Sequence, residues 1–276
     1  MKWISRRYVS IYCCCSRQRK RKAGSPFFDP YARTLAGEIG FTIMRNLEQE
    51  HGSGIENPFL PIRTKYFDDF LMRILQHTTI DQIVILAAGM DARAYRLPLL
   101  SHYKLFELDR PELIALKNQI LSNEHAIPYC DRYTIGADLS REWERQLIEA
   151  GFHPEKPTVW LAEGFFVYLK QPSVEHVLKQ VERLSASGSW LGADLISEAF
   201  INGPWAEKDR TYLKKYGLSW EFGTDEPERF LKRFGWDAQA VQPGSYEADY
   251  GRWPFPIIPR ELTDFPKTFL VTAYKK

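Results

Sequence analysis

The sequence predicts an α/β fold built on a seven-stranded, mostly parallel sheet with helices on both faces and an antiparallel last strand. From residue 82 onward, short apolar runs alternate with helical stretches. This alternation is typical of a parallel sheet that is covered on both sides. Residues 243–266, which precede the last apolar run, are too irregular for a helical crossover. They therefore favour a last strand that runs against the others.

Two helices are predicted ahead of the sheet. Residues 29–47 have a helical pattern, with Asp29 as the cap and Pro30 at the first helical position. A glycine-containing break follows, and residues 59–77 then carry apolar side chains at helical spacing. We expect these two segments to form a helical cap on the N-terminal side of the sheet.

The sheet region divides into seven strands and the segments between them. The expected strands are residues 82–86, 104–108, 133–136, 158–162, 190–196, 236–242 and 268–274. The expected helices are residues 111–122, 141–150 after a Ser140 cap, and 173–184. The crossover at 197–233 is longer than a connection requires and is rich in aromatic residues, which favours a lid or substrate wall over a plain surface excursion.

Composition limits the class of protein. The chain has 276 residues, of which 44% are hydrophobic, enough for one large domain, which we place at residues 26–276. No run of eighteen apolar residues occurs, which excludes a membrane-spanning helix. Residues 1–25 are expected to be a disordered basic tail. Its three adjacent cysteines, residues 13–15, fit a reduced cytoplasmic compartment, and lipid attachment there is the alternative.

The basic residues are concentrated in that tail. Residues 1–22 carry eight basic and no acidic residues, so the net charge of +2 leaves the rest of the chain at −6. Because no basic stripe crosses the body of the protein, nucleic-acid binding is not expected. Nor does any Cys/His cluster have the spacing of a zinc site, so no metal is expected.

Small and acidic residues follow the first two strands. In an open α/β sheet, ligands bind beyond the carboxyl ends of the strands. Ala88 and Gly89 follow the first strand and are small enough for a ligand to approach the backbone. Asp109 ends the second strand roughly twenty residues later, where an acid accepts the ribose hydroxyls of an adenosine.

The next two strand ends extend this pattern. Asp138 and Leu139 follow the third strand and suit an adenine amino group and ring face, and Glu163 follows the fourth. Taken singly, each acid also has a structural explanation, as a helix cap or an arginine partner. Together they disfavour a pyrophosphate, which requires backbone amides and glycines. They favour S-adenosyl-L-methionine, which has adenosine at one end and cationic groups at the other.

Several motifs together resemble a known family. The segments in chain order are SPFFDPYA, RTKYFDDF, VILAAGMDARAYRL, FELDRP, GADL and AEGFFVYL. They resemble the leucine carboxyl methyltransferase family of class I methyltransferases, from about residue 26 to the end. Within it, the likeness is greatest to bacterial enzymes that methylate carboxyl or hydroxyl groups of polyketides and other small metabolites. The resemblance implies a Rossmann-like, seven-stranded sheet.

The resemblance also implies roles for individual residues. Arg63 would bind the methionine carboxylate and Glu163 the amino-acid end of the cofactor. The remaining cofactor contacts would come from Ala88, Gly89, Asp109, Asp138 and Leu139. One departure is that Ala87 and Ala88 stand where many members carry glycine, which is expected to narrow the turn and lower affinity. Asp91 and Arg93 are expected to be a structural pair that holds the loop.

The expected reaction is methyl transfer to oxygen. A carboxylate acceptor is already ionised at neutral pH and needs no base; the scattered histidines offer none for a hydroxyl acceptor. Tyr168 is a candidate to orient the acceptor, or else a packing residue. The favoured function is O-methylation of a small metabolite. A protein C-terminal carboxyl methyltransferase and a non-catalytic binding protein remain alternatives, and the missing glycines disfavour a nicotinamide oxidoreductase.

Overall fold

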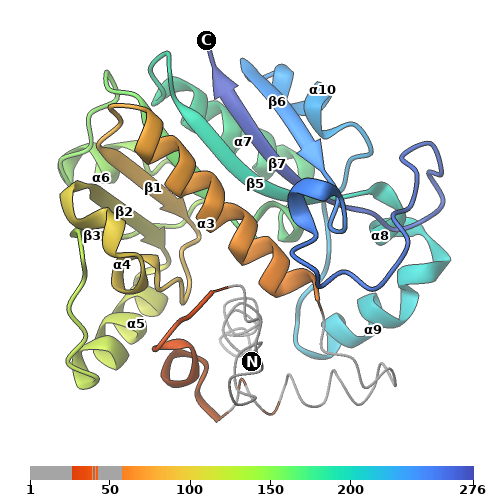
Figure 1. Ribbon diagram of the computed structural model, residues 1–276, viewed down its shortest axis with the longest axis horizontal. Helices are drawn as coiled ribbons and strands as arrows, with labels where there is room; N and C mark the ends of the chain where they lie inside the picture. The colour runs from red at the N-terminus through yellow and green to blue at the C-terminus, as the bar shows by residue number, and fades with distance from the viewer. Residues whose placement is uncertain (1–26, 39, 41, 43–57) are drawn as a thin grey trace.

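A seven-stranded sheet with strand order β3-β2-β1-β4-β5-β7-β6 lies at the centre of the molecule (Figure 1). The computed structural model describes residues 27–38, 40, 42 and 58–276. The strands are β1 (Gln82–Leu86), β2 (Lys104–Asp109), β3 (Asp131–Gly136), β4 (Thr158–Ala162), β5 (Trp190–Ile196), β6 (Trp236–Val241) and β7 (Thr268–Lys275). Only β7 runs against its neighbours, β5 and β6. The predicted fold class, including the antiparallel last strand, is therefore confirmed.

Helices connect the strands and cover the sheet. The α-helices are α3 (Phe59–His77), α4 (Arg93–Arg96), α5 (Pro111–Asn123), α6 (Glu144–Glu149), α7 (Gln171–Arg183), α8 (Glu198–Asn202), α9 (Glu207–Lys215) and α10 (Pro227–Lys232). Short 3-10 helices are η1 (Pro98–His102), η2 (Phe166–Tyr168), η3 (Pro204–Ala206) and η4 (Tyr246–Ala248). Among the described residues, no helix is long and apolar enough to cross a bilayer.

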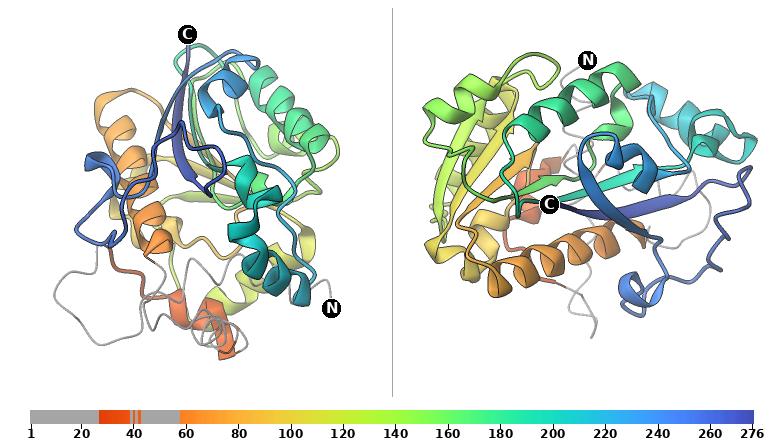
Figure 2. Two further views of the ribbon diagram at one scale, coloured as in Figure 1. Left: turned by 90° about the vertical axis from the view of Figure 1, so that its right-hand side faces the viewer. Right: turned by 90° about the horizontal axis from the view of Figure 1, so that it is seen from above.

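The two faces of the sheet bury separate apolar clusters. Along β1, Ile83 and Ile85 belong to the cluster that contains α3, whereas Val84 and Leu86 belong to the cluster that contains α7. Alternate residues of a strand point to opposite faces, so α3 and α7 cover opposite sides of the sheet. Figure 2 shows this arrangement from above, with the sheet between the two helices.

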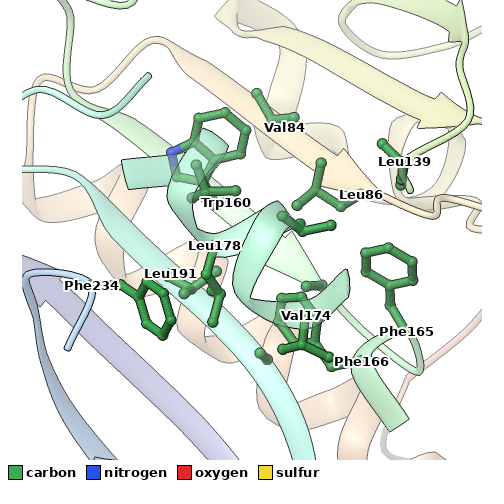
Figure 3. Close-up of a cluster of buried hydrophobic side chains, with 14 of the residues drawn as sticks. Val84, Leu86, Leu139, Trp160, Phe165, Phe166, Val174, Leu178, Leu191 and Phe234 are labelled. Carbon is green, nitrogen blue, oxygen red and sulfur yellow. The ribbon is translucent and has the colours of Figure 1, made fainter. Parts of the chain in front are cut away.

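The α7-side cluster fixes the strand ends that carry the candidate site. Figure 3 shows Trp160 of β4 beside Val84, with Leu139 and Phe165 lying toward the strand ends. Trp160 is fully buried and packs edge-on against Trp143 at a centroid distance of 6.3 Å. Burial of one such large side chain stabilises the fold by roughly 2–3 kcal/mol. The loops that leave β1, β3 and β4 therefore start from a rigid base.

Several element bounds match the predictions, whereas α7 and β3 each begin two residues before the predicted start and α6 begins three residues after it. The helix α3 and the strands β1, β4 and β5 begin and end where predicted. The prediction that Ser140 caps a helix starting at residue 141 was wrong, because α6 begins at Glu144. The Ser140 hydroxyl instead donates to Asp138 Oδ1 at 2.7 Å. Ser140 therefore takes part in a local Asx-type turn with Asp138 and does not cap α6.

The first predicted helix is only partly described. Residues 32–38 are helical, and Asp29 Oδ1 accepts a hydrogen bond from the Tyr31 amide at 3.0 Å. The remainder of the predicted segment up to residue 47 lies almost wholly outside the described residues, as does the tail at 1–25. The expectations for the tail therefore stay predictions.

The long crossover at 197–233 contains α8, η3, α9 and α10. Two backbone hydrogen bonds hold its returning segment against the strand ends. The Glu221 amide donates to the Val167 carbonyl at 2.8 Å, and the Thr224 amide donates to the Ile196 carbonyl at 2.8 Å. The crossover thus lies directly beside η2, which follows β4. Whether it acts as a lid remains a prediction.

Candidate cofactor-binding site

The four predicted strand ends lie next to one another at one edge of the sheet. β1 pairs in parallel with both β2 and β4, and β2 pairs in parallel with β3. Parallel neighbours are about 4.8 Å apart, so their carboxyl ends form one continuous edge. The segments after β1, β2, β3 and β4 therefore converge where an open α/β sheet binds its ligand.

The turn after β1 has an unusual backbone. Gly89 has a φ of 46°, and Ala87 has a φ of 52°. Glycine adopts this left-handed conformation without penalty, whereas a residue with a Cβ loses about 1–2 kcal/mol there. Alanine at position 87 therefore holds this turn with backbone strain, and the expected narrowing of the turn and lower affinity remain predictions. The Ala88 amide donates to the Leu108 carbonyl at 3.0 Å, which ties the turn to β2.

Asp109 closes this turn from the neighbouring strand. Its Oδ2 accepts from the Gly89 amide at 2.8 Å, and its Oδ1 accepts from the Arg110 amide at 2.7 Å. The side chain is buried, and that burial raises the pKa of Asp109, while the two amides partly offset the effect. A carboxylate has about four lone-pair positions, so each oxygen keeps capacity to accept a further hydroxyl. The structure thus brings Gly89 and Asp109 together, as a ribose site requires.

Asp138 and Leu139 point to different environments at the end of β3. Asp138 is exposed, and hydrogen bonds from the Ser140 hydroxyl and the Ser140 amide lower the pKa of its carboxyl. Leu139 is buried in the α7-side cluster together with Leu86 (Figure 3). The proposed contacts of these two residues with adenine remain predictions.

Arg63 and Glu163, which were predicted at the same end of the cofactor, contact each other. Arg63 Nε lies 3.0 Å from Glu163 Oε1, and Arg63 Nη1 lies 3.0 Å from Asp194 Oδ2. Asp194 also accepts the Gly164 amide at 2.5 Å. Burial raises the pKa of Asp194, with the Arg63 guanidinium acting in the opposite direction. Sequence reasoning missed Asp194, although an acid inside an otherwise apolar strand was a usable signal.

The expected pair of Asp91 and Arg93 is present and belongs to a larger buried network. Arg93 binds the Asp91 carboxylate, and the Arg93 amide donates to Asp91 Oδ1 at 2.7 Å. Arg93 also binds Asp68 and Glu163, and Arg96 binds the same Asp68 through both terminal nitrogens at 2.5 and 2.7 Å. The network therefore joins α3, α4 and the end of β4.

Tyr168, the candidate acceptor-orienting residue, ends η2 and faces the long crossover at residues 197–233. Burial raises the pKa of the Tyr168 hydroxyl to about 12, with Arg63 and a hydrogen bond involving Trp220 partly offsetting the effect. Trp220 packs edge-on against Phe200 of α8 at a centroid distance of 5.0 Å. Tyr168 thus links the end of β4 to the crossover. Within the described part of the chain, no cluster of His, Cys, Asp or Glu could hold a metal ion.

Two solved structures are similar to this chain over almost its whole length. A Thermobifida fusca protein described as a methyltransferase aligns over 98% of this chain and 94% of its own, with a TM-score of 0.57 and 15% identity. A DUF574 family protein from Streptomyces avermitilis covers 98% of this chain and 97% of its own, with a TM-score of 0.58 and 13% identity. At these identities the likeness establishes the fold, which is that of class I methyltransferases.

Curated relatives are closer in sequence. A Mycobacterium ulcerans protein named as an S-adenosyl-L-methionine-dependent methyltransferase is 36% identical over 71% of this chain and 67% of its own length. A Parafrankia protein of the same description is 44% identical over 50% of this chain, and the match spans only 44% of that relative. Residues 15–182 match the leucine carboxyl methyltransferase family. This match covers more than half of the chain and includes Arg63, Gly89, Asp109, Asp138 and Glu163, so the chain belongs to the leucine carboxyl methyltransferase family.

Proposed function

We propose that the chain is an S-adenosyl-L-methionine-dependent O-methyltransferase that methylates a carboxylate, or a hydroxyl, of a small metabolite such as a polyketide. The observation that carries the proposal is the contact between the Gly89 amide and the buried Asp109 carboxylate. Family membership and the names of the curated relatives support the same cofactor. So does the class of fold, since a magnesium protoporphyrin IX methyltransferase from Synechocystis, solved with S-adenosylhomocysteine, has a TM-score of 0.50 to this chain.

The donor set fits this cofactor. Asp109 would hold the ribose hydroxyls, with Ala88 and Gly89 beneath them, because its carboxylate lies at the turn and retains acceptor capacity. Asp138 and Leu139 would contact the adenine. Arg63 and Glu163 would hold the amino-acid end, where a cation and an anion meet a ligand that carries both charges.

The cofactor, when bound, supplies an electrophilic methyl group on a sulfonium, and the protein's task is to align an acceptor oxygen with it. The side chains described above favour a carboxylate acceptor. A hydroxyl acceptor would require a base, and the Tyr168 phenol, with its pKa raised to about 12, remains a hydrogen-bond donor at neutral pH. A protonated Tyr168 suits an acceptor oxygen that is already ionised.

The aromatic crossover supports a planar or apolar acceptor. Phe200 packs against Trp220, and Tyr212 packs against Tyr216 at a centroid distance of 5.1 Å. Such rings provide large, rigid apolar surfaces with few rotatable bonds. We therefore expect an aromatic carboxylic acid to be a better acceptor than a peptide C-terminus.

Transfer of a radiolabelled methyl group tests this proposal. The purified chain would be incubated with labelled S-adenosyl-L-methionine and one of three acceptor sets: aromatic carboxylic acids, phenols of matched size, or peptides with free C-termini. Label in base-labile esters of the aromatic acids is the expected result. Label only in peptides would replace the proposal with protein carboxyl methylation, and label only on nitrogen acceptors added as controls would refute O-methylation.

A further inference from the structure

Arg93 binds three carboxylates, although the sequence predicted only its pair with Asp91. Its side chain is 1% exposed, and its three guanidinium nitrogens each contact a carboxylate from a different part of the chain. Nε lies 2.8 Å from Asp68 of α3, Nη1 binds Asp91 of the turn after β1, and Nη2 lies 2.8 Å from Glu163 after β4. The planar guanidinium thereby fixes these three segments relative to one another.

Glu163 connects Arg93 to Arg63, because its carboxylate binds both guanidinium groups. While Oε2 of Glu163 binds Arg93, its Oε1 lies 3.0 Å from Arg63 Nε and 3.4 Å from the Thr64 hydroxyl. The orientation of the Glu163 carboxylate is therefore set by one arginine on each oxygen. Arg63 in turn contacts Asp194 at 3.0 Å, so a shift of Glu163 changes the position of the Arg63 fork.

We propose that Arg93 is a positioning residue for the amino-acid end of the cofactor, acting through Glu163 on Arg63. This inference rests on the proposed function, which assigns Glu163 and Arg63 to that end. Lysine keeps the charge at position 93 but presents a single ammonium, which cannot bind three carboxylates in one plane. The Arg93→Lys variant therefore separates the geometry of the residue from its charge.

Arg96 provides a matched control. It lies on the same helix, its side chain is 3% exposed, and it binds the same Asp68 at 2.5 and 2.7 Å. Within the described residues its other carboxylate neighbour is Asp29 at 4.0 Å, and it does not contact Glu163 or Arg63. Arg96→Lys thus imposes a similar loss on the buried network without touching the route from Arg93 to Arg63.

The test compares two ligands by calorimetry on the full chain. S-adenosylhomocysteine has the amino-acid end, whereas 5′-methylthioadenosine keeps the adenosine and thioether and lacks it. For Arg93→Lys we expect the affinity for S-adenosylhomocysteine to fall about tenfold or more, the scale of one charge-assisted hydrogen bond. The affinity for 5′-methylthioadenosine should not change. Arg96→Lys should leave both affinities unchanged at temperatures where the variant is folded.

Other results would overturn the inference. Equal losses for the two ligands, or no loss for either, would show that Arg93 only stabilises the fold. If Arg93→Lys does not fold, Glu163→Asp, which withdraws the carboxylate from both arginines by one methylene, should show the same ligand-selective loss. Its absence would refute the proposed action of Arg93 through Glu163. Failure of the unsubstituted protein to bind either ligand would instead refute the proposed function itself.

Discussion

Replacing Gly164 with alanine should disturb Arg63 without changing any charged group. Gly164 has a φ of 63°, and a Cβ built there lies 3.2 Å from Arg63 Nη1 and 3.3 Å from Nη2. The guanidinium cannot retreat without cost, because Glu163 and Asp194 each hold it at 3.0 Å. Alanine at this position must therefore shift the Arg63 fork by a few tenths of an ångström.

Two terms set the size of the effect. A Cβ in the left-handed region costs about 1–2 kcal/mol, offset by about 0.4–1 kcal/mol because alanine restricts the unfolded chain, which leaves a loss of about 1 kcal/mol. Weakening a hydrogen bond to a charged group adds about 1–2 kcal/mol. Gly164→Ala should thus lower the free energy of unfolding by about 2–3 kcal/mol and weaken S-adenosylhomocysteine binding by roughly five- to thirtyfold.

Gly251→Ala is the matched control. Gly251 has a nearly equal φ of 65°, and a Cβ there meets nothing within 4 Å. It should show the conformational loss of about 1 kcal/mol alone, with unchanged ligand affinity. Urea denaturation gives the stability of each variant, and calorimetric titration gives its affinity. Equal stabilities and equal affinities for the two variants would refute the reasoning, because they would show that Arg63 yields to the methyl group at no cost.

Three further predictions concern charge and burial. Because burial raises the pKa of Asp109, the carboxyl ionises at lower pH in the unfolded chain, so this group lowers stability as pH rises from its unfolded pKa through its folded pKa. Binding of S-adenosylhomocysteine, which needs the carboxylate, should weaken as pH falls through the folded pKa, and affinity that stays constant in calorimetric titrations at decreasing pH would contradict this. Burial raises the pKa of Cys130 to about 12, so in a variant with serine at residues 13–15 its thiol should react with Ellman's reagent only after unfolding, and rapid native reaction would contradict this. Lys117→Met should lower the free energy of unfolding by roughly 1–3 kcal/mol in urea denaturation, because it breaks a fully buried pair with Glu107 while Arg132 still binds that carboxylate; unchanged stability would contradict this.

Strong periodicity explains why much of the fold was predictable from the sequence. The strands β1, β4 and β5 are predominantly apolar and buried, and α3 carries apolar side chains at helical spacing, so their bounds matched. β3 begins two residues earlier than predicted because Arg132, which looks like a loop residue, is satisfied by Glu107 at 2.7 Å. The short helices of the crossover have no such periodic signal.

From the residues alone, the candidate site was predictable only where a residue ends or follows a strand, whereas Arg63 on α3 was expected from the family resemblance. Asp109 and Glu163 stand at strand ends, and parallel strands place their ends together. Asp194 lies inside β5, and its partner Arg63 is 131 residues away in the chain. Asp68 lies on α3, and its role in the network depends on ion pairs with Arg93 and Arg96 of α4. Local patterns do not reveal such pairings, because they depend on the packing of α3 against the sheet.

Calorimetric titration of the full chain with S-adenosylhomocysteine, alongside Asp109→Ala and Asp131→Ala, tests the central claim most directly. Asp131 is a matched acid at the opposite end of the sheet, at the start of β3 and exposed. We predict micromolar binding by the unsubstituted protein, its loss in Asp109→Ala and its retention in Asp131→Ala. Absence of binding by the folded, unsubstituted protein, or undiminished binding by Asp109→Ala, would contradict a cofactor site at these strand ends.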